Sequence, residues 1–338
     1  MITVLLVTSR GLYPWLDTPL GTYDLLADSL RAQTLPRDDF EVVIVDKFNP
    51  PPRRELGFLG DRVRFYRPRP TPWTERGFFA AAAARNTGLI HARGDVVLAL
   101  DDGWELGPRT LERVAHHAAA GRYVVPQLRD RGGGVQRFRA PGMSDDLPGG
   151  ILAFPLAAAV GINGVCERYD GCAGYEDVDF SRRLSAVGVE WARDDPDAHV
   201  VGHQHEPRLA QPRCGLLVWL LNEARRAAGG ARALLGCEPW SADELAALEG
   251  CGRELDPPRC ARTVKHDPRV GEYGGQCDYD EDLAFEQESE PTRAARVGLR
   301  RPSALVKLVQ RTYEARPWLD LAAERERAAR NAATARMT

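Results

Sequence analysis

Three short apolar segments of this 338-residue chain each run into polar side chains. Each segment is dominated by Val, Ile and Leu, as is typical of a strand buried inside a parallel sheet. Parallel strands bring their carboxyl ends to one edge of the sheet, and open α/β sheets bind ligands at that edge. The segments are 2–8, 41–46 and 95–100, and the polar residues at or after their ends are Thr8, Ser9, Arg10, Asp46, Asp101 and Asp102.

An acidic pair at such an edge suits a phosphorylated ligand. The adjacent carboxylates of Asp101 and Asp102 can hold a divalent cation through oxygen ligands, and that cation would neutralise a diphosphate as it leaves. Asp46 can accept hydrogen bonds from a nucleobase or a ribose. A single Asp after a strand more commonly caps a helix or forms a turn. The convergence of three strand ends favours the ligand site.

A second group of acids lies in the segment 174–184, which reads GYEDVDFSRRL. Acids at this spacing suit the first turn of a helix, where carboxylates interact favourably with the positive end of the helix dipole. That structural role is one alternative. In the other, one of the carboxylates is a general base that deprotonates an acceptor hydroxyl.

A third group combines two histidines with an acid, in His203, His205 and Glu206. It follows a strand-like stretch that begins at His199. A lone histidine is more commonly structural than a ligand, but this clustering indicates a candidate metal ligand.

The remaining pattern of the first 212 residues predicts the elements that would position these groups. Strands that alternate with helices imply βαβ units, and hence an α/β fold with a mainly parallel sheet flanked by helices. Residues 129–150, which include three consecutive glycines, show almost no periodicity and are expected to form a long loop, which at this length is usually functional or disordered. Helices are expected at 25–33, 78–91 and 108–119, with Gly94 as the stop signal of the second, and further strands at 62–66 and 123–126. Regular patterning returns at 150–154.

The order of these signals resembles family-2 glycosyltransferases of the GT-A fold. Those proteins open with a strand and a Thr-containing turn, followed by a helix that ends near SLRAQT, here residues 29–34. They continue with an ARNxG helix, here 84–88, and an xGDxxxxLDxD segment, here from Arg93. A GxEDxDxxxRLxxxG segment follows, here 174–188. Residues 203–207 are similar to the HQEP ending of chondroitin-polymerase-like members, with one inserted residue.

The resemblance implies a reaction and a role for each group. The reaction is metal-dependent transfer of a sugar from a nucleotide-diphosphate sugar, by family analogy a UDP-sugar, to a hydroxyl acceptor, with inversion at the anomeric carbon. The implied cofactor is Mn²⁺ or Mg²⁺. The implied residues are Thr8, Ser9, Arg10, Asp46, Arg85, Asp101 and Asp102 for the nucleotide, Asp102 with His203 or His205 for the metal, and Asp177 as the base with Glu176 beside it.

Two departures from the family pattern leave other functions open. The third acid of the metal motif falls on Gly103, so the metal contact would shift to Asp102 or Glu105, or weaken. After Asp46 the usual second acid and Gly-Ser pair are missing, which would alter base recognition. A catalytically silent nucleotide-sugar or glycan-binding protein is one alternative. A sugar nucleotidyltransferase is another, but the segment after Thr8 does not resemble the Gly-rich basic loop of that class.

Composition sets the expected location of the protein. The net charge of −3 provides no global field that would attract nucleic acid or an anionic membrane. No apolar run approaches the roughly 20 residues that span a bilayer, and the N-terminus lacks a basic region and a cleavage site. The seven cysteines are expected to be mostly free thiols in a reducing compartment. A cytoplasmic protein is therefore expected.

The chain is expected to divide near residue 212. Residues 1–212 would form the catalytic domain, with a nucleotide-binding half at 1–105 and an acceptor half at 106–212. Residues 213–338 would form a mostly helical and irregular extension. Its Arg-rich tail from residue 292 could contact a membrane surface, form an oligomer contact or pack on the catalytic domain. Its dispersed cysteines and His266 offer a weaker zinc alternative.

Overall fold

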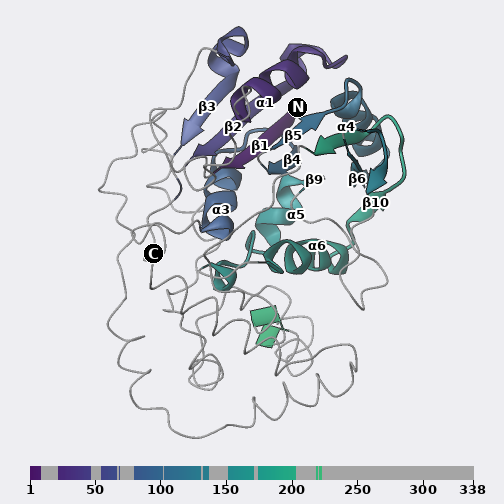
Figure 1. Cartoon of the computed structure of the whole chain (residues 1–338). Coiled ribbons are helices and arrows are strands. Elements are labelled where there is room, and N and C mark those ends of the chain that lie inside the picture. Colours follow the sequence, from purple (N-terminus) through teal and green to yellow (C-terminus); the bar gives the residue numbers. More distant parts are fainter. Residues whose placement is uncertain are drawn as a thin grey trace, which may run out of the picture.

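The computed structural model describes residues 1–8, 22–46, 55–66, 68, 80–101, 103–130, 132–136, 151–170, 174–202, 218–219 and 221–222. From residue 2 to residue 101, strands alternate with helices or 3₁₀ turns, as the apolar pattern predicts (Figure 1). No helix within these ranges is both long enough and apolar enough to cross a bilayer.

Five strands form the central sheet in the order β3-β2-β1-β4-β9. Four of them run parallel, namely β1 (Ile2–Thr8), β2 (Phe40–Asp46), β3 (Val63–Tyr66) and β4 (Val96–Asp101), whereas the edge strand β9 (Leu152–Pro155) is antiparallel to β4. The chain moves outward from β1 to β3 and then returns to the other side of β1 as β4. Such a reversal of strand order marks the ligand-binding edge of open α/β sheets. The predicted α/β fold with a mainly parallel sheet is confirmed.

Helices cover both faces of this sheet. Val4 and Leu6 of β1 belong to one apolar cluster with residues of α1 and α4, whereas Leu5 and Val7 belong to a second cluster with residues of α3, α5 and α6. Successive side chains of a strand point to opposite faces, so α3 and α6 lie on the same side of the sheet. The helices are α1 (Thr22–Arg31), α3 (Ala81–His91), α4 (Thr110–Ala119), α5 (Leu156–Gly161) and α6 (Glu176–Ala186), with short 3₁₀ turns η2 (Arg37–Asp39), η3 (Gly57–Arg62) and η4 (Glu167–Tyr169).

Two smaller sheets complete the described structure. The four-stranded sheet has the order β5-β11-β7-β8, and β6 pairs with β10 in a parallel two-stranded sheet. The pairing of β11 with β5 places Gly202 opposite Trp104. The end of β11 therefore lies beside the segment that leaves β4. The strands are β5 (Trp104–Leu106), β6 (Arg122–Val124), β7 (Gln127–Arg129), β8 (Val135–Gln136), β10 (Glu190–Ala192) and β11 (His199–Gly202).

The segment expected to be one long loop begins with a hairpin. Strands β7 and β8 pair antiparallel, and the three glycines 132–134 lie between them. Asp130 closes the turn, because its Oδ1 accepts from Gly134 N at 2.8 Å and its own N–H donates to Gly134 O at 2.9 Å. Gly133 has a φ of 81°, a left-handed conformation that favours glycine. The expectation of an irregular loop is therefore wrong at this end, and residues 137–150 lie outside the described residues.

Gly94 has a different role from the helix stop signal that its position suggests. Helix α3 ends at His91, with Ala92 as its C-cap. A Cβ atom on Gly94 would lie only 2.6 Å from the backbone nitrogen of Thr3, and Gly94 N donates to Thr3 Oγ1 at 2.9 Å. A side chain is excluded here because the backbone of residue 94 packs directly on the start of β1.

Candidate active site

The strand ends that the sequence predicts to converge do so in the sheet register. Thr8 at the end of β1 lies opposite Asp46 at the end of β2, and Val7 lies opposite Asp101 of β4. Thr8 and Asp46 are buried, with exposed fractions of 0% and 2%. These groups therefore share the carboxyl edge at which the order of strands reverses. Ser9, Arg10 and Asp102, predicted for the same site, lie outside the described residues.

Arg85 joins this edge to the start of α6. Its Nη2 donates to Asp101 Oδ1 at 2.9 Å, and its Nη1 donates to Glu176 Oε1 at 2.9 Å. Burial works against the charge of Arg85, but the carboxylates of Asp101, Glu176 and Asp177 more than offset this effect and raise its pKa. Arg85, which is expected to bind the nucleotide, is thus held between carboxylates from two parts of the chain.

Helix α3 holds Arg85 at this place through contacts along its length. Asp170 accepts from the N–H groups of Ala82 and Ala83 at 2.9 and 3.0 Å, and so satisfies two donors of the first turn. The amide of Asn86 donates to Val165 O and accepts from Val165 N, each at 2.8 Å. These bonds fix the position of the helix against the segment after α5.

Gly88 lets the same helix approach the sheet closely. A Cβ atom on Gly88 would lie only 2.1 Å from Cδ1 of Leu5 in β1 and would clash with that side chain. The ARNxG motif therefore combines three separate contributions. Arg85 links carboxylates, Asn86 anchors the helix, and Gly88 permits the contact with β1.

Glu176 and Asp177 form the first turn of α6, as the acidic pattern predicts. Gly174 and Tyr175 precede them with φ angles of 88° and 71°. The left-handed conformation is costly for a residue that is not glycine, and such residues cluster at active sites. Tyr175 therefore marks a tightly determined turn that directs the two carboxylates to the site.

The carboxylates of the site do not all carry full charge at neutral pH. Burial raises the pKa of Asp101, although the Arg85 charge opposes this shift. Burial, and next the charge of Glu176, raise the pKa of Asp177 to about 7. Asp177 Oδ1 also accepts from Val178 N at 2.7 Å. A carboxyl with a pKa near 7 can both take up and release a proton under physiological conditions, as a general base requires.

Carboxylates outnumber cationic groups among these residues. Three carboxylates, from Asp101, Glu176 and Asp177, surround the single guanidinium of Arg85. The carboxylate excess supplies the hard oxygen donors that Mg²⁺ and Mn²⁺ prefer. The residues that the sequence predicts as ligands, Asp102, His203 and His205, all lie outside the described residues. Within the described part of the chain, no three His, Cys, Asp or Glu side chains are grouped as a metal site.

Gly103 has a structural reason to replace the third acid of the family motif. Its φ is 79°, so the chain turns through a left-handed conformation between β4 and β5. Glycine adopts this conformation at no steric cost, whereas for most other residues the conformation is unfavourable.

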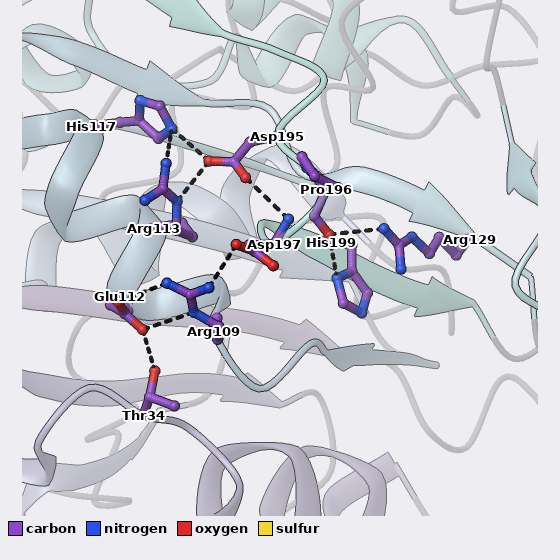
Figure 2. Close-up of polar contacts among 10 residues, drawn as sticks. All are labelled: Thr34, Arg109, Glu112, Arg113, His117, Arg129, Asp195, Pro196, Asp197 and His199. Atoms are coloured by element: carbon purple, nitrogen blue, oxygen red, sulfur yellow. Dashed lines mark hydrogen bonds and ion pairs between the residues drawn. The ribbon is translucent and has the colours of Figure 1, made fainter.

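A second polar cluster, shown in Figure 2, fixes the far end of β11. Asp195 Oδ2 accepts from Arg113 Nε at 2.8 Å and lies 2.7 Å from His117 Nε2. Asp197 Oδ2 accepts from Arg109 Nη1 at 2.8 Å. Although burial opposes the shift, the bonds from His117 and Arg113 lower the pKa of Asp195 to about 2. The cluster ties α4 to the loop before β11, at the end of that strand remote from Gly202.

Residues 26–181 match the sequence profile of glycosyl transferase family 2. This part of the chain is therefore similar to family-2 glycosyltransferases. The matched range includes Arg85, Asp101, Glu176 and Asp177. A search of curated protein sequences returned no match.

Solved structures of other proteins share the fold of this domain. S. aureus TarS matches with a TM-score of 0.51 at 14% sequence identity, over 97% of this chain and 54% of that protein chain. The chain thus spans about half the length of that structure. S. aureus TarS 1–349 in complex with UDP-GlcNAc matches with a TM-score of 0.50 at 15% identity, over 99% of this chain and 91% of that one. The likeness supports the GT-A fold of the domain.

Three residues of the domain escaped prediction from sequence. Asn86 lies in the ARNxG motif, so its place beside Arg85 was a signal of its role. Asp170 caps α3 from 88 positions away, and no local pattern points to that contact. Tyr175 resembles any aromatic residue before a helix, because a left-handed backbone conformation leaves no mark on a tyrosine.

Proposed function

We propose that the protein is an inverting glycosyltransferase that moves a sugar from a UDP-sugar to a hydroxyl acceptor, with Asp177 as the general base. The observation that carries this proposal is the raised pKa of Asp177, about 7, in a carboxylate group linked by Arg85 to the ligand-binding edge of the sheet. The match to the family-2 profile supports the reaction class.

In the proposed reaction, the acceptor oxygen attacks the anomeric carbon as the bond from that carbon to the diphosphate breaks. The proton of the acceptor hydroxyl passes to the Asp177 carboxylate, and the electron pair of the breaking bond leaves with UDP. A single displacement of this kind inverts the anomeric configuration. A base near its pKa accepts the proton efficiently at neutral pH.

The donor would bind along the carboxyl edge of the sheet. Thr8, Ser9, Arg10 and Asp46 are proposed to hold the nucleotide, with Arg85 and Asp101 beside the diphosphate. The UDP-GlcNAc complex of TarS supports a uridine nucleotide, because that fold accommodates it. Mn²⁺ or Mg²⁺, held by Asp102 with His203 or His205, would neutralise the diphosphate.

Release of UDP from sugar nucleotides tests this proposal without knowledge of the acceptor, since water can replace it. UDP-, GDP-, TDP- and CDP-sugars would be incubated with the protein in manganese and in EDTA. Proton NMR of the first product formed would give the anomeric configuration. Hydrolysis of one nucleotide class, with inversion and dependence on manganese, is the expected result. A product of retained configuration would contradict the single displacement.

A catalytically silent nucleotide-sugar-binding protein is the second candidate, and the left-handed Gly103 favours it. Calorimetric titration of the four nucleoside diphosphates, each with manganese and with EDTA, separates the two. Binding without any hydrolysis would support the silent protein. Absence of both binding and hydrolysis would contradict each of them.

A further inference from the structure

A short helical piece beyond the matched family domain packs beneath the start of α6. Residues 218, 219, 221 and 222 are helical, and Figure 1 shows them in green below α6. Trp219 has an exposed fraction of 0% and Asn222 one of 8%. The family match ends at residue 181, so these buried side chains come from a part of the chain that the profile does not include.

Trp219 contacts the turn that places the carboxylates. Its ring centroid lies 5.9 Å from that of Tyr175, and the guanidinium of Arg182 lies 5.6 Å from the Trp219 ring centroid. Tyr175 immediately precedes Glu176 and Asp177 and holds a left-handed conformation. An unfavourable conformation persists only where the surrounding structure enforces it. Packing of Tyr175 against a fully buried Trp219 provides such enforcement.

Asn222 of the same helical piece contacts η4, the turn that precedes the cap of α3. Its Oδ1 accepts from Arg168 Nη1 at 3.0 Å, and its Nδ2 donates to Tyr169 Oη at 3.2 Å. Tyr169 directly precedes Asp170, which caps α3 and so supports the helix of Arg85. The two residues therefore contact both segments that position the carboxylates, Trp219 through Tyr175 and Asn222 through η4.

We propose that Trp219 is a positioning residue for Glu176 and Asp177, acting through the ring of Tyr175. This role rests on the proposed function, because it supposes that Asp177 is the base. It also makes the segment at 218–222 a functional part of the catalytic domain, although the segment lies beyond the family match. The proposed role concerns the geometry of the base and not the binding of the nucleotide at the strand ends.

Kinetics of UDP-sugar hydrolysis with the full chain test this role. A shift of a catalytic group by about 1 Å can cost roughly 100-fold in rate, so Trp219→Leu is expected to lower kcat by roughly 10- to 100-fold, with KM for the donor changed less than about 3-fold. Trp219→Phe keeps an aromatic partner for Tyr175 and is expected to retain kcat within about 3-fold. UDP binding by calorimetry is expected to stay unchanged in both variants.

A double-mutant cycle shows whether the effect passes through Tyr175. Tyr175→Leu is expected to lower kcat as Trp219→Leu does, and the double variant to lose little more than either single one. Phe40→Leu is the matched control, because Phe40 is also fully buried but belongs to the cluster on the other face of the sheet. It is expected to lower Tm without lowering kcat per folded molecule.

The outcomes separate this role from the proposed function. Hydrolysis by the wild type together with an unchanged kcat in Trp219→Leu, or with fully additive losses in the double variant, would overturn the positioning role alone. Absence of hydrolysis by the wild type, with the protein folded, would overturn the proposed function and this role with it.

Discussion

Arg85 and Glu176 are 91 positions apart in the sequence, yet Arg85 Nη1 donates to Glu176 Oε1 at 2.9 Å. The second nitrogen of the same guanidinium donates to Asp101 at the end of β4. One planar side chain therefore spans the two halves of the site, the strand edge and the start of α6. A guanidinium suits this place because its rigid fork offers parallel donors to two carboxylates and stays charged when buried.

Removal of the guanidinium is expected to cost both stability and activity. Arg85→Met would leave Asp101 and Glu176 without their shared partner, and breaking a buried ion pair in this way costs about 3 kcal/mol in the free energy of unfolding. Arg85→Lys keeps the charge but loses the fork, so its stability should lie between those of Arg85→Met and the wild type. Urea unfolding measures the order. Equal stability of the three proteins would contradict the bridging role.

Asp177→Asn is expected to abolish hydrolysis and transfer while the fold remains intact. The amide keeps the shape of the side chain but cannot accept the acceptor proton, and loss of a general base lowers kcat by about 100- to 10,000-fold. Calorimetry with UDP should show unchanged binding. Glu190→Gln is the matched control, because Glu190 is exposed on β10. Activity in Asp177→Asn equal to that of Glu190→Gln would exclude Asp177 as the base.

The raised pKa of Asp177 predicts a pH profile. A base must be deprotonated to act, so kcat/KM should fall about tenfold per pH unit below a midpoint near 7. Burial is the main cause of this raised pKa, and the negative charge of Glu176 is the second. Glu176→Gln should therefore move the midpoint of the kcat/KM profile to lower pH. A kcat/KM midpoint near pH 4 in the wild type would contradict the assignment of a buried Asp177 as the base.

The same shift affects stability in the opposite direction from a usual acid. Between the ordinary aspartate pKa of 3.8 and about 7, Asp177 binds more protons in the folded state than in the unfolded state. Its contribution to the free energy of unfolding is therefore present at low pH and is lost as pH rises through 7. Urea unfolding in EDTA should give the wild type a lower free energy of unfolding at pH 8 than at pH 5. This difference between the two pH values should be smaller in Asp177→Asn.

Local patterns predicted much of the fold, whereas contacts distant in sequence escaped them. The apolar runs identified β1, β2 and β4, because a buried strand needs apolar side chains on both faces. The register that brings Thr8 beside Asp46 follows from parallel pairing and was predictable. Arg85 was selected from a motif, but its bonds to Asp101 and Glu176 depend on how α3 and α6 cross the same face of the sheet, which no spacing encodes.

Two local signals were misread because their physical cause lies elsewhere. Gly94 looked like a helix stop, but β1 packs against its backbone. The glycines at 132–134 looked like part of a long loop, but Asp130 closes a hairpin around them. In both cases the sequence shows where a glycine is, but not which neighbouring residue makes a glycine necessary at that position. The predicted roles of Ser9, Arg10, Asp102, His203 and His205 remain predictions.

The cap of α3 offers a test of how the Arg85 helix is held. Asp170→Ala removes the acceptor for Ala82 N and Ala83 N, and loss of a cap costs about 1 to 2 kcal/mol. Asp170→Asn keeps one carbonyl acceptor and should cost less. Thermal unfolding ranks the variants. Asp38→Ala is the control, because this exposed acid lies on a surface turn, and it is expected to change stability by less than about 1 kcal/mol.

The cluster of Figure 2 should make the protein sensitive to acid. The pKa of Asp195 is about 2 in the folded state, below the ordinary aspartate value of 3.8, so its contribution to stability is present above pH 4 and is lost as pH falls toward 2. Asp195→Asn weakens the bonds to Arg113 and His117, and a hydrogen bond to a charged group contributes about 1.5 to 3 kcal/mol. The variant should therefore be less stable than the wild type at pH 7, and the difference should shrink at pH 3. Strand β11 begins within this cluster and ends opposite Trp104. If the difference in stability between Asp195→Asn and the wild type did not depend on pH, Asp195 would hold this strand by packing and not by charge.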